Sequence, residues 1–191
     1  MLQLNFHPFP NLTTERLVLR QLNPGDDNEI FALRSDDRVN KFLDRSKCAT
    51  IEDAREFIDK INNGITNNES VYWGITLKND NKVIGTICFW NISKKYYKAE
   101  AGFELHPDFQ GKGIMHEALS KIIQFGFSFM RLKSIEGWTH GRNINSIKIL
   151  EKNNFKRDTD AENKNRGKEE LVNMVIYSLS KKSFEDAGSV K

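Results

Sequence analysis

The sequence predicts a single α/β domain, in which a mostly antiparallel mixed sheet is flanked by helices. Apolar segments with strand alternation are concentrated in the middle of the chain and are separated by short polar turns. Other segments carry apolar residues at helical spacing, and they lie between the predicted strands. No internal repeat or linker divides the 191 residues, a length that suits one well-cored domain.

The N-terminal third predicts one strand and two helices. Residues 12–22 alternate leucine with charged residues, which indicates a half-buried strand. A Pro-Gly pair then breaks this strand and opens a helix that runs to about Ser35. Thr50 and Asp53 have the spacing of a capping box and predict the start of a second helix. Gly64 and the Asn-rich stretch after it are expected to end that helix.

The middle of the chain predicts an antiparallel meander followed by a helix. Residues 71–77 and 83–90 read as strands, and the polar residues 78–82 between them indicate a hairpin turn. Residues 98–106 are expected to form the third strand. A helix then starts near Lys112 and packs on the sheet through the apolar positions Met115, Leu119, Ile122, Phe125 and Phe129.

The last segments extend the sheet. Residues 134–139 predict a strand, and Asn143 begins a helix that ends near residues 153–154. Phe155 starts another strand, for which residues 171–179 are the expected partner.

Charged residues crowd the stretch between these two strands. Residues 156–170 contain ten of them and predict an exposed loop or hairpin tip. We expect residues 1–180 to form the domain and residues 181–191 to be a flexible tail.

Composition limits the partners of the chain. The net charge of +3 comes from 29 basic and 26 acidic residues, which is too mildly basic to predict nucleic-acid binding. No apolar run approaches the roughly 20 residues that span a bilayer, and the N-terminus lacks the features of a signal peptide. Cys48 and Cys88 have no metal-like spacing, so we expect no metal site and a cytoplasmic location.

Residues 107–118, with the sequence PDFQGKGIMHEA, are the most informative motif. They read as a strand end, a turn with two glycines and the first turns of a helix. Gly111 and Gly113 allow the backbone to pass close to a ligand, and the helix start directs free N–H groups and a positive dipole to the same place. This arrangement predicts a phosphate or pyrophosphate site.

Two familiar phosphate loops do not fit this motif. A P-loop requires four residues between its glycines and a Gly-Lys-Ser/Thr ending, which Gly111-Lys112-Gly113 does not provide. A Rossmann fingerprint requires a third glycine where His116 stands, and a parallel βαβ unit around it.

The remaining pattern, Gln110-x-x-Gly113, resembles the acetyl-CoA loop of the GNAT superfamily of N-acetyltransferases. Residues 99–107 before the motif and 143–155 after it, together with residues 14–20, resemble the subfamily of ribosomal-protein N-terminal acetyltransferases. The resemblance covers residues 12 to about 179. It departs from the family at Met115, where Gly or Ala is usual, and at Asn153-Asn154-Phe155.

The resemblance implies a set of residues that bind the donor, acetyl-CoA. The loop residues would hold its pyrophosphate, mainly through backbone N–H groups. A backbone N–H near Leu105 would face the thioester carbonyl, within a pair of splayed strands, 101–106 and 134–139. Asn143 would contact the pantetheine amides, although asparagine is also a preferred N-cap, and Ser146 would protonate the departing thiolate. The loop residues are Gln110, Gly111, Lys112, Gly113, Ile114 and Met115.

Glu104 is the candidate general base or ammonium-orienting group, because it alternates with Gly102 and His106 on the strand before the loop. A solvent-facing surface pair is the alternative interpretation of Glu104. His106 is the second candidate base, since the ordinary pKa of histidine is about 6.5.

The acceptor is expected to be a primary amine, first of all a protein N-terminal α-amine of the ribosomal-protein type. A small amine (polyamine, amino acid derivative or antibiotic) is the alternative, and a catalytically silent acyl-CoA-binding domain is a third. We expect a monomer or homodimer without nucleic-acid or membrane partners.

Overall fold

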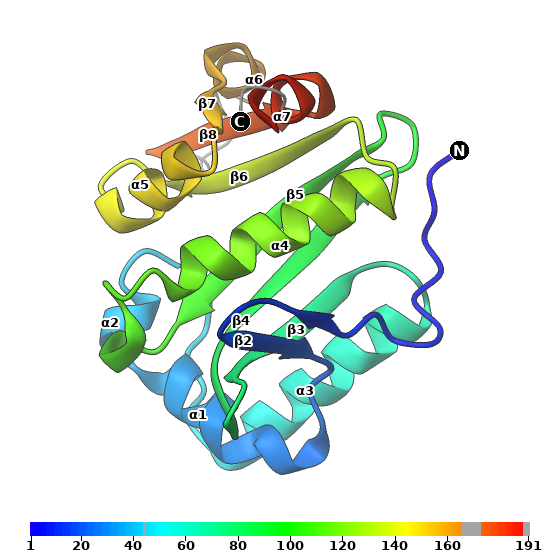
Figure 1. The fold of residues 1–191 in the computed structure, drawn as a ribbon. Coiled ribbons are helices and arrows are strands. Elements are labelled where there is room, and N and C mark those ends of the chain that lie inside the picture. Colours follow the sequence, from blue (N-terminus) through cyan, green and yellow to red (C-terminus); the bar gives the residue numbers. More distant parts are fainter. Residues whose placement is uncertain (44, 166–172, 189–191) are drawn as a thin grey trace.

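A computed structural model describes residues 1–43, 45–165 and 173–188, and within them the chain forms one eight-stranded sheet with helices on both faces (Figure 1). The strands follow the order β1-β2-β3-β4-β5-β6-β8-β7. Their bounds are β1 Leu12–Thr13, β2 Leu17–Arg20, β3 Val71–Leu77, β4 Asp80–Ser93, β5 Lys98–Leu105, β6 Ser134–His140, β7 Lys156–Arg157 and β8 Met174–Ser180. The predicted α/β domain with a mostly antiparallel sheet is confirmed.

The centre of the sheet contains its one parallel pair among the described strands, β5 and β6. These strands pair only where residues 98–100 face residues 134–136. Beyond this point β5 remains paired with β4 and β6 with β8, but β5 and β6 no longer pair with each other. The predicted splay of the two central strands is therefore confirmed, and it leaves two strand edges facing each other.

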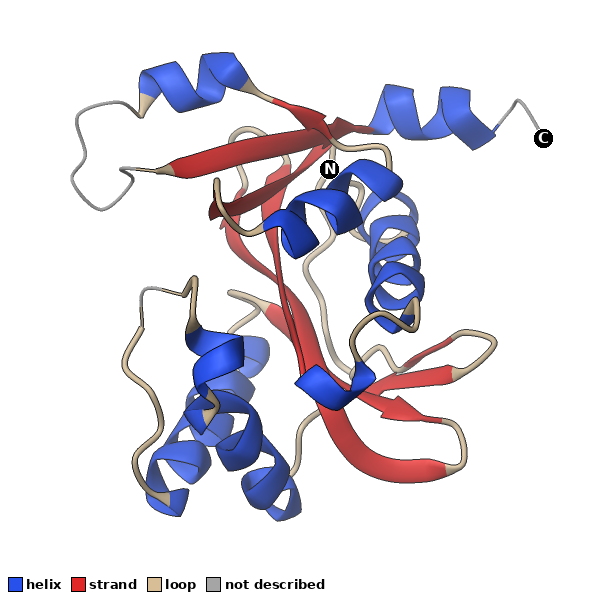
Figure 2. Ribbon diagram, turned by 90° about the vertical axis from the view of Figure 1, so that its left-hand side faces the viewer, coloured by secondary structure: helices blue, strands red, loops and turns tan. Residues whose placement is uncertain are grey.

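The helices cover the sheet in two groups (Figure 2). Helices α1 to α3 lie on one face, whereas α4 and α5 lie on the other. Short helices α6 and α7 pack against β8. Their bounds are α1 Asp27–Ser35, α2 Asp37–Asn40, α3 Ile51–Thr66, α4 Ile114–Ser128, α5 Ile144–Lys152, α6 Thr159–Lys164 and α7 Lys181–Gly188, with 3₁₀ turns at Pro24–Asp26 and Pro107–Phe109.

Each face of the sheet has its own hydrophobic core. The larger core lies under α4, where Trp73 packs edge-on against Phe89 and Phe125. The predicted apolar face of α4 supplies much of this core, and burying one large apolar side chain contributes about 1.5–3 kcal/mol. Phe129 is the exception, because it follows the last residue of the helix and is 36% exposed. The smaller core lies under α1 and α3 and includes Ile30 and Ile58.

The capping box predicted at Thr50 and Asp53 is present. Thr50 Oγ1 accepts from the Asp53 N–H at 3.2 Å, and Asp53 Oδ2 accepts from the Thr50 N–H at 3.0 Å. Gly64 does not end the helix as expected, because α3 continues to Thr66. The Asn-rich stretch ends it instead: the Asn67 N–H bonds back to the helix.

The prediction of one strand over residues 12–22 is wrong, because two strands, β1 and β2, form a hairpin there. The turn closes at Thr14, whose N–H donates to the Leu17 carbonyl at 3.1 Å. Thr14 Oγ1 also accepts from the Leu17 N–H at 2.9 Å. The alternation of leucines could not reveal this turn, since it contains no glycine or proline.

Other boundaries also differ from expectation. The hairpin turn expected at residues 78–82 is shorter, since β4 already begins at Asp80. The expected loop over residues 156–170 contains β7 and α6, and its remainder from 166 lies outside the described residues. The same is true of residues 171–172 of the strand expected at 171–179. Along the described chain, no helix has the length and apolar character needed to cross a membrane.

The C-terminal tail is more ordered than expected. Residues 181–188 form helix α7, and the last three residues lie outside the described part. The ring of Phe184 lies 5.2 Å from that of Phe127, so an apolar contact holds the helix against the core.

Candidate active site

The loop between β5 and α4 has the backbone geometry that the glycines predict. Gly111 and Gly113 have φ values of 74° and 76°, in the left-handed region that side chains disfavour. Gly113 is the N-cap of α4, so the first N–H groups of the helix have no partner within the helix. A Cβ placed on Gly111 would meet no atom within 4 Å, so this side of the loop is open to a ligand.

The other loop residues present either backbone groups or a side chain to the surface of the loop. The side chains of Ile114 and Met115 are buried in the core under α4, so only their backbone groups face the loop. The side chain at position 115 therefore points away from the ligand side, which makes the departure at Met115 mild. Lys112 Nζ lies 5.5 Å from the centre of the Phe109 ring.

The N-terminal hairpin holds this loop in place. Arg16 Nε lies 2.6 Å from Glu117 Oε2 in the first turn of α4, and Arg16 Nη1 donates to the Lys112 carbonyl at 3.0 Å. Thr14 Oγ1 donates to Glu117 Oε1 at 2.5 Å. Burial works to raise the pKa of Glu117, but the hydrogen bonds from Thr14 and Arg16 outweigh it and lower that pKa.

The end of β5 places the Leu105 amide toward the splayed gap. The neighbouring His106 N–H donates to the Ile84 carbonyl of β4 at 2.8 Å. Because successive N–H groups of a strand point to opposite sides, the Leu105 amide points toward β6. Gln110 Nε2 donates to the Leu105 carbonyl at 3.0 Å, so the Gln110 side chain fixes this strand end rather than extending into the open side of the loop.

The Glu104 side chain lies on the opposite face of β5 from the α4 core, and the residue as a whole is only 8% exposed. Thr86 Oγ1 donates to Glu104 Oε1 at 3.1 Å. Arg45 Nη2 lies 2.5 Å from Glu104 Oε2, and Arg34 Nη1 lies 3.7 Å from Glu104 Oε1. Glu104 is thus a buried ion-pair partner, and the alternative of a solvent-facing surface residue is wrong.

Three further contacts fix the arginines beside Glu104. Asn40 is buried at the end of α2 and accepts from Arg45 Nε at 2.9 Å through its Oδ1. Its Nδ2 donates to the Arg34 carbonyl at 2.8 Å. The Arg34 guanidinium lies 3.7 Å from the centre of the Phe57 ring. Sequence reasoning missed both arginines, because they occupy no motif and reach Glu104 only in the folded chain, Arg34 from α1 and Arg45 from the segment between α2 and α3.

His106 is partly buried at the start of the 3₁₀ turn after β5. Its Nδ1 accepts from the Asp108 N–H at 3.4 Å and lies 3.8 Å from Asp108 Oδ2. The imidazole therefore caps the turn, in agreement with a structural contribution at this strand end.

Asn143 is the N-cap of α5, as its alternative interpretation held. Its Oδ1 accepts from the Ser146 N–H at 3.3 Å, so the two residues are adjacent at the helix start. Helix α5 lies on the α4 side of the sheet, whereas Glu104 points to the α1–α3 side. Ser146 and Glu104 therefore approach the splayed strands from opposite faces.

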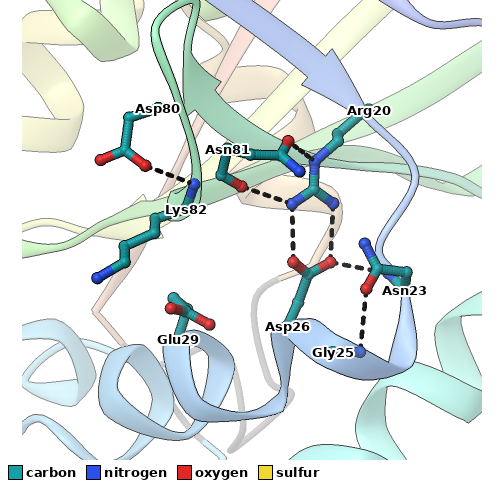
Figure 3. Close-up of a pocket in the computed structure, with 8 residues that line it drawn as sticks. All are labelled: Arg20, Asn23, Gly25, Asp26, Glu29, Asp80, Asn81 and Lys82. Carbon is teal, nitrogen blue, oxygen red and sulfur yellow. Dashed lines mark hydrogen bonds and ion pairs between the residues drawn. The ribbon is translucent and has the colours of Figure 1, made fainter.

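A separate pocket of about 250 Å³ lies near the β3–β4 turn and contains none of these residues (Figure 3). Arg20 dominates it: its two terminal nitrogens bond the Asp26 carboxylate at 2.8 and 2.7 Å, and one of them the Asn81 carbonyl at 2.8 Å. Because these groups satisfy one another, the arrangement ties the 3₁₀ turn at Pro24–Asp26 to the sheet.

Comparison with known proteins relates this chain to acetyltransferases. Residues 16–156 match the sequence profile of the acetyltransferase (GNAT) domain. An uncharacterized N-acetyltransferase of Bacillus licheniformis, p20, is 30% identical over 173 residues, which cover 91% of this chain and 97% of p20.

Two solved structures have the same fold. The ribosomal-protein-S5-alanine acetyltransferase of Vibrio fischeri superposes with a TM-score of 0.76 at 22% identity, covering 92% of this chain and 98% of the other. The microcin C7 self-immunity acetyltransferase MccE, solved in complex with acetyl-CoA and AMP, has a TM-score of 0.70 at 22% identity, covering 87% and 93% of the two chains.

Proposed function

The chain belongs to the GNAT family of N-acetyltransferases, and we propose that it acetylates a protein N-terminal α-amine of the ribosomal-protein type with acetyl-CoA as donor. The observation that carries the donor is the loop at Gly111 and Gly113, which opens beside the gap between β5 and β6. The presence of acetyl-CoA in the MccE structure supports the same donor.

The chain offers a consistent set of groups for this donor, which supplies an activated acetyl thioester. The backbone N–H groups of residues 111–115 would hold the pyrophosphate at the positive end of α4. The Leu105 amide would donate a hydrogen bond to the thioester oxygen, where negative charge develops. The Asn143 and Ser146 side chains would reach the pantetheine arm from the α5 side.

Side chains on the two faces of the gap between β5 and β6 would carry out the proton transfers. Glu104 would orient the amine and accept its proton, directly or through a water. To do so, the amine or water must compete with Arg45 for Glu104 Oε2. His106 is the second candidate for this step, and the Ser146 hydroxyl would give its proton to the departing sulfur.

The choice of acceptor draws on the solved relatives. The Vibrio fischeri enzyme, whose name specifies the alanine of a ribosomal protein, superposes over nearly its whole length. The fold similarity to MccE, whose solved complex contains the small molecule AMP beside acetyl-CoA, keeps a small amine as the alternative acceptor. A catalytically silent acyl-CoA-binding domain is the third candidate.

One experiment separates these candidates. Release of free CoA is followed with acetyl-CoA and a panel of N-terminal peptides, polyamines and amino acid derivatives. Turnover of peptides alone supports the proposed acceptor, whereas turnover of small amines alone supports the alternative. Binding of acetyl-CoA without turnover of any amine would identify a silent binder and contradict the proposal.

We propose further that the protein acts in the cytoplasm as a monomer or homodimer. Cys48 and Cys88 are both free and buried, which agrees with a reducing compartment. Light scattering after gel filtration measures the oligomeric state.

A further inference from the structure

Among the residues that the structure describes, the cluster of Arg34, Arg45 and Glu104 carries more positive than negative charge. The ion pairs of Arg34 and Arg45 both end on Glu104 within the described residues, so two guanidinium groups share one carboxylate. The three side chains are 13%, 21% and 5% exposed. A buried cluster with an excess charge is costly unless a counter-charge completes it.

The hydrogen-bonding capacity of this cluster is also incomplete. Arg34 Nε is buried and has no hydrogen-bond partner within the described residues. Arg45 Nη2 and Glu104 Oε2 are 2.5 Å apart, yet they are not aligned as a hydrogen bond. N–H groups of both arginines can therefore donate to a further oxygen ligand without breaking an existing hydrogen bond.

The described side chains that contact Thr86 and Glu104 do not supply the missing negative charge. Tyr72 OH contacts Thr86 Oγ1 at 2.9 Å, and burial raises the pKa of Tyr72 well above its ordinary value. Burial likewise raises the pKa of Cys88 to about 12. Both groups are neutral at pH 7, so the described part of the cluster keeps an excess of one positive charge.

The arginines are fixed in position before any ligand arrives. Asn40 Oδ1 accepts a hydrogen bond from Arg45 Nε, and the Arg34 guanidinium packs over the Phe57 ring. Rigid guanidinium groups suit the planar geometry of a carboxylate. Glu104 precedes Leu105, whose amide points into the gap between β5 and β6, so an anion bound here lies beside the reacting amine.

We propose that Arg34 and Arg45 bind a carboxylate of the acceptor, which is therefore a primary amine with a carboxylate a few bonds from its nitrogen. The proposal rests on the proposed acetyl transfer and names the class of its acceptor. Such a carboxylate has two sources: an acidic residue at the N-terminus of a peptide, or the α-carboxylate of a free amino acid. The excess positive charge also favours the neutral form of the amine, the form that attacks the thioester.

The test compares acceptors that differ only in the carboxylate. Initial rates of CoA release are measured for a peptide that begins with aspartate against the same peptide beginning with asparagine. Free alanine is compared with alaninamide. We expect kcat/KM to favour the carboxylate in at least one pair by roughly 10- to 100-fold, the range of a charged hydrogen bond. The pair that shows the preference identifies the source.

Variants then assign the preference to the two arginines. Arg34→Gln and Arg45→Gln should each raise KM for the carboxylate acceptor and leave KM for acetyl-CoA unchanged. Arg55→Gln is the matched control, since Arg55 pairs with Asp27 and Glu52 on the same group of helices but does not contact Glu104. Arg45→Lys keeps the charge and loses the planar fork, so it tests the site if Arg45→Gln does not fold.

A binding measurement gives a readout without turnover. The acetylated product that carries the carboxylate should raise the melting temperature of the wild-type protein more than its amide counterpart does, and the two arginine variants should lose this difference. Equal wild-type rates for both members of each pair would overturn the inference. An equal loss for both members in the variants would also overturn it, since that indicates a structural contribution.

Failure of the inference and failure of the proposed function are distinguishable. If neutral amines are acetylated and carboxylates bring no advantage, the inference fails and the function stands. If acetyl-CoA binds and no amine in the panel is acetylated, the function itself fails.

Discussion

Arg16 and Glu117 are 101 residues apart in the sequence, and in the fold Arg16 Nε lies 2.6 Å from Glu117 Oε2. This contact ties the β1–β2 hairpin to the first turn of α4. Since Arg16 Nη1 also bonds the Lys112 carbonyl, the hairpin supports the loop from outside. The shape of the glycine loop therefore depends on a segment far away in the sequence.

Glu117→Gln should weaken acetyl-CoA binding by about tenfold and lower stability by about 1 kcal/mol, because the ion pair and a charge-assisted hydrogen bond are lost. Titration calorimetry measures the affinity, and urea unfolding measures the stability. Glu52→Gln removes an exposed partner of Arg55 and should change neither. Unchanged affinity in Glu117→Gln would show that the hairpin does not support the loop.

The pH dependence of Glu117 follows from its lowered pKa. A carboxylate whose pKa is lower in the folded than in the unfolded state stabilises the fold above the unfolded value of 4.5. This contribution is lost as pH falls through the folded pKa. Melting temperatures from pH 7 down to pH 3 should thus fall less steeply for Glu117→Gln than for the wild type.

Gly113→Val should weaken acetyl-CoA binding at least tenfold and destabilise the fold by about 1–3 kcal/mol, because a β-branched residue resists the left-handed backbone at φ 76°. Gly113→Asn is the matched control, since asparagine tolerates this conformation. Thermal shifts with and without acetyl-CoA separate the two effects. Similar affinities of Gly113→Val and Gly113→Asn for acetyl-CoA would contradict the idea that binding needs the left-handed backbone at this position.

Glu104→Gln should lower kcat more than tenfold and leave the KM for acetyl-CoA nearly unchanged, because it removes the proposed proton acceptor. It should also lower stability by a few kcal/mol, since two buried guanidinium groups lose their anionic partner. Glu100→Gln changes the same residue type on the same face of β5 and serves as the control. Full turnover in Glu104→Gln would transfer the assignment to His106.

The titration of Glu100 should change the stability of the fold with pH in the opposite sense to the titration of Glu117. Burial raises its pKa to about 7, with a smaller contribution from Glu136. Because the folded pKa lies above the unfolded value of 4.5, the folded protein binds the proton more tightly, and stability falls as pH rises from about 4.5 to 7. Glu100→Gln should remove this fall and be more stable than the wild type at pH 8 by about 2–3 kcal/mol. Urea unfolding of both proteins at pH 5 and pH 8 measures this difference. An equal change in stability between the two pH values for wild type and variant would contradict the prediction.

The sequence predicted the features that local chemistry specifies. The glycine turn before α4, the amphipathic α4 and the Thr50 capping box depend on neighbours within a few residues, and each is present. The splay of β5 from β6 came from the resemblance to a family, and the pairing confirms it.

Features that arise from long-range packing could not be predicted in this way. The turn at Thr14 is closed by a side-chain hydroxyl that also bonds Glu117, far away in the sequence. Arg34 and Arg45 reach Glu104 across about 60–70 residues, and no spacing relates the three. The capping function of Asn143 was visible locally, whereas its proposed contact with the donor remains a prediction.

The short pairing of β5 with β6 has a consequence for the stability of the protein in solution. A sheet whose central strands part after residues 98–100 has two interior edges with unpaired backbone groups. Such edges are attachment points for a strand of another molecule. A ligand that hydrogen-bonds to both edges would close the sheet, so occupancy of the gap would slow amide exchange along it and suppress aggregation as well as permit catalysis.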